Sequence, residues 1–187
     1  MKKVLVAMGG ASGSIYGIKL LEILKKSNVE THLIISNGAK KIIEYETKYS
    51  HNDVLVSADF TYENDDLFAG PASGSFSLDE MVICPCSMKT LSAVANGYGD
   101  TLTTRAACCV LKESKTLILV PRETPIDLTG LKNMVKAKEA GAIILPAMPG
   151  FYHKPKSIDE VVNFIVGKIL NQLEIKHHLY QSWGSKE

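Results

Sequence analysis

Short apolar runs alternate along this chain with longer segments in which apolar residues recur at helical spacing. The first run covers residues 4–8, and after it apolar residues repeat every three positions at Ile15, Ile18, Leu21 and Leu24. A short run of branched apolar residues is typical of a buried strand, whereas the three-residue repeat is typical of one helix face. The alternation predicts an α/β fold, with a Rossmann-like (flavodoxin-like) parallel sheet and helices on both of its faces.

The same alternation continues to the end of the chain. We expect further strands over residues 30–36, 53–59, 80–85, 116–121 and 142–146, and helices over residues 37–47, 87–97, 102–113, 129–141 and 157–173. The strand over 53–59 has the weakest pattern. Residues 62–76 have no periodicity and predict a long functional loop. Because the chain has no repeat and no linker-like segment, we expect one domain over residues 1–187, with residues 174–187 as a C-terminal tail.

The composition excludes several classes of protein. The chain carries 21 basic and 20 acidic side chains, a net charge of +1, so no charge excess points to nucleic acid or to a membrane surface. The start resembles a secretory signal, but its apolar stretch, residues 4–8, is shorter than the roughly 7–15 residues that such signals need. No stretch reaches the ~18 apolar residues of a membrane span. We therefore expect a cytoplasmic protein.

The four cysteines predict no metal site. They occur as Cys84 and Cys86, separated by a proline, and as the neighbours Cys108 and Cys109. Neither pair has the CxxC spacing of a zinc or redox motif, and no histidine lies close to them in the sequence. We expect buried or partly buried thiols, and the pattern assigns these cysteines no role.

Four loops after predicted strands carry small, hydroxyl, charged or aromatic residues where a plain connector needs only a turn. They cover residues 9–13, 85–90, 121–125 and 146–155. In parallel sheets, ligands bind beyond the carboxyl ends of the strands. The sequence therefore predicts that these four loops form one site.

The first loop, Gly9-Gly10-Ala11-Ser12-Gly13, joins a strand to a helix. It does not fit the dinucleotide fingerprint G-x-G-x-x-G, and it lacks the Lys-Ser/Thr pair of a P-loop. Its small residues and the hydroxyl of Ser12 suit close approach by a planar ligand, and the backbone N–H groups at the helix start favour an anion. A tight turn without a ligand is the alternative.

The second and third loops add donors. Ser87 begins a helix after a strand, where its hydroxyl and the following N–H groups favour a phosphate, and Lys89 and Thr90 extend this set. An ordinary N-cap serine is the alternative that stays open. Arg122 and Glu123 lie together where a buried strand ends, so they could bind an anion and supply a proton. A solvated surface pair would have the same sequence.

Further polar residues flank predicted apolar faces. Glu46 follows an apolar pair at helical spacing and could move protons. Arg105 and Lys112 are seven residues apart on one helix and could add positive charge. Tyr152 lies in a Pro-Gly-Phe-Tyr-His turn, and Lys168 flanks an apolar helix stripe. Solvent-facing side chains, and for Lys168 a stem packed along apolar surface, are the alternatives.

Several loop segments occur together in an order that is more specific than any one of them. They are "GGASGSIYG", "LIIS", "ETK", "PASGSF", "VICPCSMKTLSAVA", "VLKE", "PRETP" and "PAMPGFYHKP", with Trp183 near the end of the chain. This ordered set covers nearly the whole chain and resembles the flavin prenyltransferases of the UbiX type. Members of that family have also carried the label of aromatic-acid decarboxylases.

The resemblance implies a flavoprotein that joins dimethylallyl phosphate to N5 and C6 of reduced FMN. Its product, prenylated FMN, is the cofactor of a separate class of decarboxylases. The resemblance also implies a homo-oligomer, a dodecamer, in which subunits share the contacts to the donor.

Carried over position by position, the resemblance assigns FMN contacts to Gly10, Ala11, Ser12, Ser36, Ser87, Met88, Lys89, Thr90 and Arg122. It assigns donor-phosphate contacts to Tyr152 and Lys168, with Lys112 and Glu123 near the same phosphate. Glu46 matches a carboxylate implicated in proton movement at the flavin, and we expect Ser12 to take part in that movement. Some relatives have arginine at the position of Lys168, and a lysine there keeps the charge but loses bidentate binding.

The residues agree with a reaction that needs no metal. Prenyl transfer from a diphosphate usually needs an Asp-rich magnesium site, and "ENDDLF" has no second paired carboxylate at the required spacing. Without a metal, a monophosphate leaving group must be neutralised by cations and protonated by an acid. Lys112, Arg122 and Lys168 could supply the charge, and Glu123 the proton.

Two other functions stay open. An FMN-dependent decarboxylase of cysteine-derived carboxylates needs a catalytic histidine after the first helix, and the nearest candidate, His32, falls within a predicted strand. A flavin carrier would explain the FMN loops but would leave Glu46, Glu123 and Tyr152 without a role. The sequence does not indicate which acid the downstream decarboxylase processes.

Overall fold

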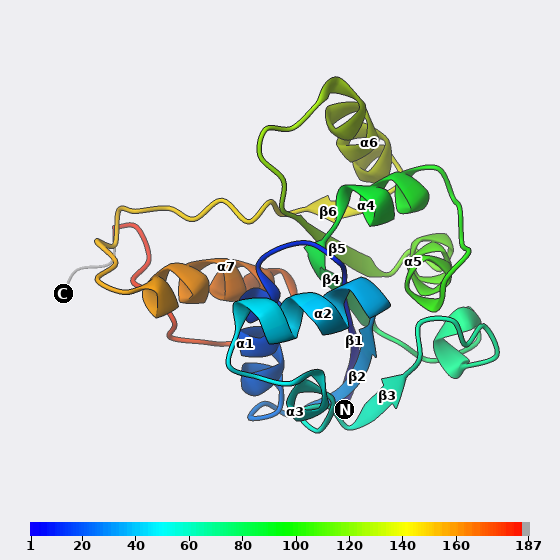
Figure 1. Cartoon of the computed structure of the whole chain (residues 1–187), viewed down its shortest axis with the longest axis horizontal. Coiled ribbons are helices and arrows are strands. Elements are labelled where there is room, and N and C mark those ends of the chain that lie inside the picture. Colours follow the sequence, from blue (N-terminus) through cyan, green and yellow to red (C-terminus); the bar gives the residue numbers. More distant parts are fainter. Residues whose placement is uncertain (185–187) are drawn as a thin grey trace.

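Six parallel strands form one sheet through the middle of the molecule (Figure 1). The computed structural model describes residues 1–184. In spatial order the strands are β3 (Phe60–Tyr62), β2 (Val29–Ile35), β1 (Lys2–Met8), β4 (Glu80–Cys86), β5 (Thr116–Pro121) and β6 (Ile143–Ile144). Each neighbouring pair is parallel. The predicted parallel α/β fold is confirmed.

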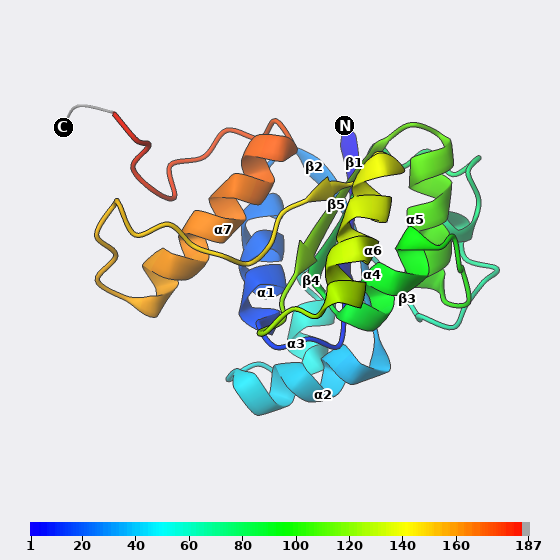
Figure 2. The ribbon, with the colours of Figure 1, turned by 90° about the horizontal axis from the view of Figure 1, so that it is seen from above.

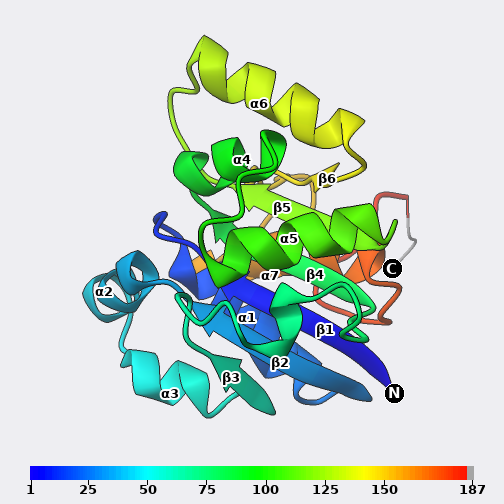
Figure 3. The ribbon, with the colours of Figure 1, turned by 90° about the vertical axis from the view of Figure 1, so that its right-hand side faces the viewer.

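Helices cover both faces of this sheet (Figure 2). On one face lie α1 (Ser14–Leu24) and α7 (Ile158–Gln172), and on the other lie α4 (Met88–Ala95), α5 (Leu102–Lys112) and α6 (Leu128–Glu139). The remaining helices, α2 (Asn37–Glu46) and the short α3 (His51–Leu55), follow β2. Figure 3 shows α2 beyond the carboxyl end of β2, on the side away from the N-terminus of the chain.

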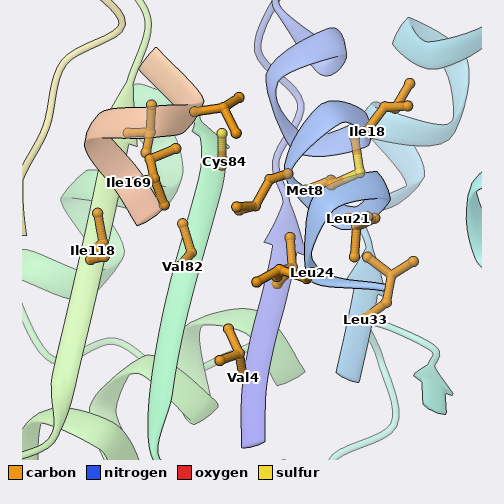
Figure 4. Packing of buried hydrophobic residues seen from close by; sticks show 14 of the residues in the cluster. Val4, Met8, Ile18, Leu21, Leu24, Leu33, Val82, Cys84, Ile118 and Ile169 are labelled. Atoms are coloured by element: carbon orange, nitrogen blue, oxygen red, sulfur yellow. The ribbon is translucent and has the colours of Figure 1, made fainter. Parts of the chain in front are cut away.

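The core explains why the strands are apolar throughout. Successive residues of a strand point to opposite faces, and in β1 the side chains of Val4, Val6 and Met8 belong to the core cluster that includes α1 and α7. Figure 4 shows Val4 and Met8 in this cluster. Leu5 and Ala7 pack toward the other helical layer. Helices bury both faces of β1, so a polar side chain at any position from Val4 to Met8 would be buried at a cost in free energy.

The strand expected over residues 53–59 is wrong. Ser50 begins a helix there, because its side chain accepts a hydrogen bond from the Asp53 N–H while the Asp53 carboxylate accepts one from the Ser50 N–H at 2.8 Å. This reciprocal capping fixes a helix start where the apolar residues alone fit a strand. The edge strand begins only at Phe60, where it pairs with His32 of β2.

Two other expectations needed only small changes. The loop over residues 62–76 contains one short 3₁₀ turn, Gly70–Ala72, and is otherwise irregular after Tyr62, as predicted. The last strand is shorter than the predicted 142–146, and after it the chain runs irregularly from residue 145 to 157. Figure 1 shows this segment extending away from the sheet before the chain returns through α7.

Candidate functional site

The strand order reverses between β1 and β4, and the loops after these two strands meet there. The Gly9 N–H donates to the Pro85 carbonyl at 2.9 Å, and a Cβ on Gly9 would lie 2.7 Å from that oxygen. Only glycine permits this approach without a shift of the backbone. In open parallel sheets ligands bind at such a reversal, and the loops after β1 and β4, two of the four predicted to form the site, meet here.

A cavity of about 370 Å³ lies at this edge and is lined mainly by small and hydroxyl residues. Its lining residues are Gly9, Gly10, Ser36, Asn37, Gly38, Asn64, Ser87, Lys89, Thr90, Thr101 and Thr103. Five of the predicted cofactor contacts, Gly10, Ser36, Ser87, Lys89 and Thr90, therefore lie together. This convergence comes from two loops and the starts of two helices on neighbouring parts of the sheet edge.

Two serines of the cavity begin helices. Ser36 Oγ accepts a hydrogen bond from the Ala39 N–H at 3.2 Å, and Ser87 Oγ accepts one from the Thr90 N–H at 3.3 Å. Both are therefore N-caps, and the positive ends of α2 and α4 are directed at the cavity. The exposed ammonium of Lys89 adds positive charge, with the Asp100 carboxylate 3.9 Å away. The site suits a phosphate group.

The hinge after β1 carries further predicted contacts. Ala11 is buried, and the carbonyl of Ser12 accepts a hydrogen bond from Arg122 Nε at 3.3 Å. Arg122 lies at the end of β5, so this bond joins the first and third predicted loops. None of Ala11, Ser12 and Arg122 lines the 370 Å³ cavity, and neither does Met88, whose methyl group packs against Gly130 of α6.

The carboxylate of Glu46 occupies the N-terminus of α1. Its Oε2 accepts hydrogen bonds from the Gly13 N–H at 2.8 Å and from the Ser14 N–H at 3.4 Å. Gly13 has a φ of +99°, a conformation that glycine adopts readily. The sequence predicted that this helix start would favour an anion, and the anion that it binds is the side chain of Glu46, which is otherwise exposed.

Glu123 follows Arg122 directly and is exposed. One of its carboxylate oxygens accepts a hydrogen bond from the Thr124 N–H at 3.1 Å. Arg122 and Glu123 line one small hollow together with Met148, and Met148 also lines a larger hollow that reaches Lys168. The arginine–carboxylate pair is thus connected along the surface to the lysine of α7.

Tyr152 and Lys168 lie beside one aromatic ring. The ring centroids of Tyr152 and Phe164 are 5.8 Å apart, and the Lys168 ammonium is 5.7 Å from the Phe164 centroid. Tyr152 comes from the irregular segment after β6, whereas Phe164 and Lys168 come from α7. The structure therefore brings together the two residues predicted to bind the donor phosphate.

Lys112 does not join this group within one chain. It ends α5, four residues before β5 begins at Thr116, and Thr116 pairs with the first residue of β4. Lys112 therefore lies near the amino ends of the strands, with its ammonium 3.4 Å from the Glu113 carboxylate. Arg105, on the same helix, donates from Nε to the Ala72 carbonyl at 2.9 Å and so fixes the long loop.

Asn64, Thr101 and Thr103 line the cavity but were not predicted. The Asn64 side-chain oxygen accepts hydrogen bonds from the Thr103 N–H at 3.2 Å and from the Thr103 hydroxyl at 2.6 Å. This pairing holds the long loop against the start of α5. Polar loop residues such as Asn64 are common, so no local pattern could have selected it.

His32 is not placed for catalysis at this edge. It is 2 % exposed within β2, where Nδ1 is 2.9 Å from the Tyr62 hydroxyl and Nε2 is 3.0 Å from the Glu30 carboxylate. It is absent from the lining of the 370 Å³ cavity. His32 is therefore not placed to act as the catalytic histidine of a decarboxylase of cysteine-derived carboxylates.

The cysteines are buried or half-buried free thiols, as predicted. Burial raises the pKa of the Cys86 thiol to about 12 and that of Cys84 above its ordinary value, so neither forms a thiolate readily. Within residues 1–184, no group of three or more His, Cys, Asp or Glu side chains is arranged to hold a metal ion. No helix in the same part of the chain is long and apolar enough to cross a membrane.

Comparison with known proteins places the fold and site in a class and then in a family. Residues 1–170 match the family described as Flavoprotein. The flavin prenyltransferase UbiX of Methanocaldococcus jannaschii is 47% identical over 183 residues, which are 98% of this chain and 99% of that protein. The chain therefore belongs to the flavoproteins and, among them, to the flavin prenyltransferases of the UbiX type.

Solved structures agree closely with this fold. A crystal structure of AnUbiX (PadA1) in complex with FMN and dimethylallyl pyrophosphate superimposes with a TM-score of 0.97 at 41% identity, covering 100% of this chain and 99% of that one. A dodecameric FMN-dependent UbiX-like decarboxylase from Escherichia coli O157:H7 superimposes with a TM-score of 0.96 at 43% identity, covering 98% and 100%.

Proposed function

We propose that this protein is a flavin prenyltransferase, which joins the dimethylallyl group of dimethylallyl phosphate to N5 and C6 of reduced FMN. The observation that carries the proposal is that side chains suited to bind anions gather in two separate places. One is the hydroxyl-rich cavity at the ends of β1 and β4, and the other is the pair of Tyr152 and Lys168. A carrier of flavin alone has no use for the second.

The cavity fits the phosphate and polyol of FMN. Ser36, Ser87 and Thr90 offer hydroxyl groups, the starts of α2 and α4 offer backbone N–H groups, and Lys89 offers charge. At Gly10 the backbone approaches Gly38 closely, since a Cβ on Gly10 would lie 3.4 Å from the Gly38 Cα. FMN, when bound, supplies the nucleophilic ring atoms. Ala11, Ser12 and Arg122 would hold the ring system of FMN. The backbone of Met88, the first residue of α4, would add a contact at the start of that helix.

Lys168 and Tyr152 would bind the donor phosphate. An ammonium and a phenol hydroxyl suit a phosphate ester, because one supplies charge and the other a directed hydrogen bond. The relative AnUbiX was crystallised with dimethylallyl pyrophosphate. For this chain we propose the monophosphate as donor, since the cations Arg122 and Lys168 and the acid Glu123 can stabilise a monophosphate leaving group.

Cleavage of the carbon–oxygen bond leaves an electron pair and negative charge on the phosphate. Arg122 and Lys168 would stabilise that charge, and Glu123 would protonate the leaving oxygen. Glu46 and Ser12 would move protons at the flavin, because Ser12 lies in the hinge after β1 and the Glu46 carboxylate binds the Gly13 N–H of that hinge.

Assembly would complete the donor site. We propose a dodecamer like that of the Escherichia coli relative, in which Lys112 of one subunit approaches the site of another. Lys112 lies far from the carboxyl edge of its own sheet, so a shared contact would account for its predicted role. We further propose that the product serves a separate decarboxylase, and that the protein works in the cytoplasm, where its free cysteines would stay reduced.

Mass spectrometry of the flavin tests this function. The purified protein is incubated with FMN, dithionite and dimethylallyl phosphate. The bound flavin is then released and its mass is measured. We expect a flavin that has gained the prenyl carbons, and none when the donor is omitted. Binding of FMN without any adduct would instead identify a flavin carrier.

A further inference from the structure

We propose that Tyr180, in the C-terminal segment after α7, is a positioning residue that holds the ammonium of Lys168 ready for the donor phosphate. The inference rests on the proposed function, in which Lys168 binds that phosphate. It concerns residues 175–183, which form no helix or strand and which the sequence predicted only as a tail.

The Lys168 ammonium lies against two aromatic rings. It is 5.7 Å from the Phe164 centroid and 5.8 Å from the Tyr180 centroid, and these two rings are themselves 4.9 Å apart. Aromatic faces attract a cation without neutralising it. Within residues 1–184 no carboxylate forms an ion pair with Lys168, so its charge is available to an incoming anion while its position is restricted.

Hydrogen bonds fix Tyr180 on α7. The Asn171 side-chain amide donates to the Tyr180 hydroxyl at 2.9 Å, and the Asn171 side-chain oxygen lies 2.9 Å from His177 Nε2, which donates to it. The other ring nitrogen, His177 Nδ1, accepts from the Leu179 N–H at 3.2 Å. Asn171 is three residues after Lys168, so the anchor and the lysine lie on the same side of the helix.

Gly167 makes room for this segment. A Cβ at position 167 would lie 2.5 Å from Tyr180 Cε1 and 2.8 Å from His177 Cε1. Any larger residue would displace the two rings from the helix. The smallest residue therefore stands where the aromatic segment crosses α7, directly beside Lys168.

The same segment also contacts Tyr152, the second proposed donor ligand. The ring of Trp183 meets the Tyr152 ring edge to face, with centroids 5.3 Å apart. Tyr152 in turn meets Phe164 edge to face. One short stretch of chain thus contacts both groups that would bind the donor phosphate, which simple coverage of the apolar face of α7 would not require.

The test compares Tyr180→Leu with Tyr180→Phe in the full-length, FMN-loaded protein. Leucine removes the aromatic face, whereas phenylalanine keeps the face and loses only the bond to Asn171. We expect Tyr180→Leu to raise the KM for dimethylallyl phosphate by about 3- to 10-fold, the range of an exposed to half-buried cation–π contact, with little change in kcat. Tyr180→Phe keeps the aromatic face, so its KM for dimethylallyl phosphate should stay within about twofold of that of the parent.

A second measurement uses the fluorescence of Trp183, the single tryptophan of the chain. The FMN-loaded protein is titrated with inorganic phosphate, the group that the donor and the product share. We expect the parent emission to change on binding, and Tyr180→Leu to need a several-fold higher phosphate concentration. Lys168→Ala should abolish the response.

The outcomes separate this inference from the proposed function. If the parent forms the adduct and Lys168→Ala raises the KM, but Tyr180→Leu follows the parent in both measurements, the inference alone is wrong. A loss of kcat and FMN affinity without a change in the donor KM would give Tyr180 a purely structural role. If Tyr180→Leu does not fold, Gly167→Ala replaces it, because a Cβ at position 167 would displace the Tyr180 ring from α7, and it should raise the donor KM in the same direction. A parent that forms no adduct overturns both proposals.

Discussion

The Glu46 carboxylate and the Gly13 backbone N–H are joined by a hydrogen bond of 2.8 Å, so the end of α2 is tied to the start of α1. This bond places a carboxylate beside the hinge that follows β1. The same group stabilises the helix start, because a negative charge there interacts favourably with the helix dipole. Glu46 therefore has a structural and a proposed chemical role, which experiment must separate.

Substitution of Glu46 by glutamine separates these roles. The amide oxygen still accepts from the Gly13 N–H, so we expect folding and FMN affinity to change little. It cannot take up a proton, so adduct formation should slow by about 100-fold, as is typical when a general acid–base group is lost. Single-turnover kinetics give the rate, and thermal unfolding gives the control. Unchanged kinetics would leave Glu46 only its capping role.

Arg122 is expected to hold the flavin and the hinge together. Its Nε donates to the Ser12 carbonyl at 3.3 Å, and its charge lies beside the site. Arg122→Ala should weaken FMN binding by about 1.5–3 kcal/mol, the range for a charge-assisted hydrogen bond. Arg122→Lys keeps the charge but not the planar guanidinium, so its FMN affinity should lie between those of the parent and of Arg122→Ala. Equal FMN affinity of the alanine variant and the parent by titration calorimetry would exclude this role.

The reaction is expected to need no divalent metal, because cations and an acid of the chain can stabilise a monophosphate leaving group. We expect the same rate of adduct formation in EDTA and in magnesium. The assay uses dimethylallyl phosphate at saturating reduced FMN, with dimethylallyl pyrophosphate as the comparison donor. Activity that disappears with EDTA and returns with magnesium would refute a metal-free reaction.

Lys168 and Tyr152 are expected to serve the donor and not the flavin. Lys168→Ala should raise the KM for dimethylallyl phosphate by about 10-fold or more, since a charge-assisted hydrogen bond is lost, and FMN affinity should not change. Tyr152→Phe should shift the KM in the same direction. Lys132→Ala, which removes an exposed lysine of α6, is the matched control. Two variants that both follow the parent curve would place the donor site elsewhere.

Much of the fold could be predicted because burial on both faces forces strong local patterns. The run over residues 4–8 became β1, and the three-residue repeat after it became α1. Ser36 and Ser87 marked helix starts, since their position before an apolar repeat has a local physical cause. The loops of the site followed from the rule that parallel strands present their carboxyl ends at one edge.

The differences between the predicted and the observed structure have several causes. A helix forms in place of the strand expected over residues 53–59, because Ser50 and Asp53 make reciprocal hydrogen bonds at its start. The serine and aspartate that form this capping box can be read from the sequence. The contact of Asn64 with Thr103 joins residues 39 positions apart, so no local pattern carries it. The position of Lys112 could have been predicted, because a helix between parallel strands returns the chain to their amino ends.

The buried imidazole of His32 makes stability depend on pH. Burial lowers the pKa of His32, and the opposing effect of the Glu30 carboxylate is smaller. The folded protein therefore binds fewer protons at this group than the unfolded chain, whose histidines titrate near 6.5. His32 contributes its full stabilisation above that pH, and the contribution is lost as the pH falls below it.

Thermal unfolding between pH 7 and pH 5 tests this dependence. Glu30, Asp59 and Tyr62 near His32 do not titrate within this window. Hydrogen bonds lower the pKa values of Glu30 and Asp59 from ordinary values that already lie below the window, and burial raises the pKa of Tyr62 from an ordinary value above it. We expect the Tm of the parent to fall steeply as the pH is lowered. The Tm of His32→Gln at pH 7 should be lower than that of the parent, because a buried hydrogen-bonded group is altered. Between pH 7 and pH 5 it should fall less steeply than the Tm of the parent. His178→Gln, which changes an exposed histidine, should keep the steep slope of the parent. Equal slopes in all three proteins would show that His32 does not titrate with unfolding.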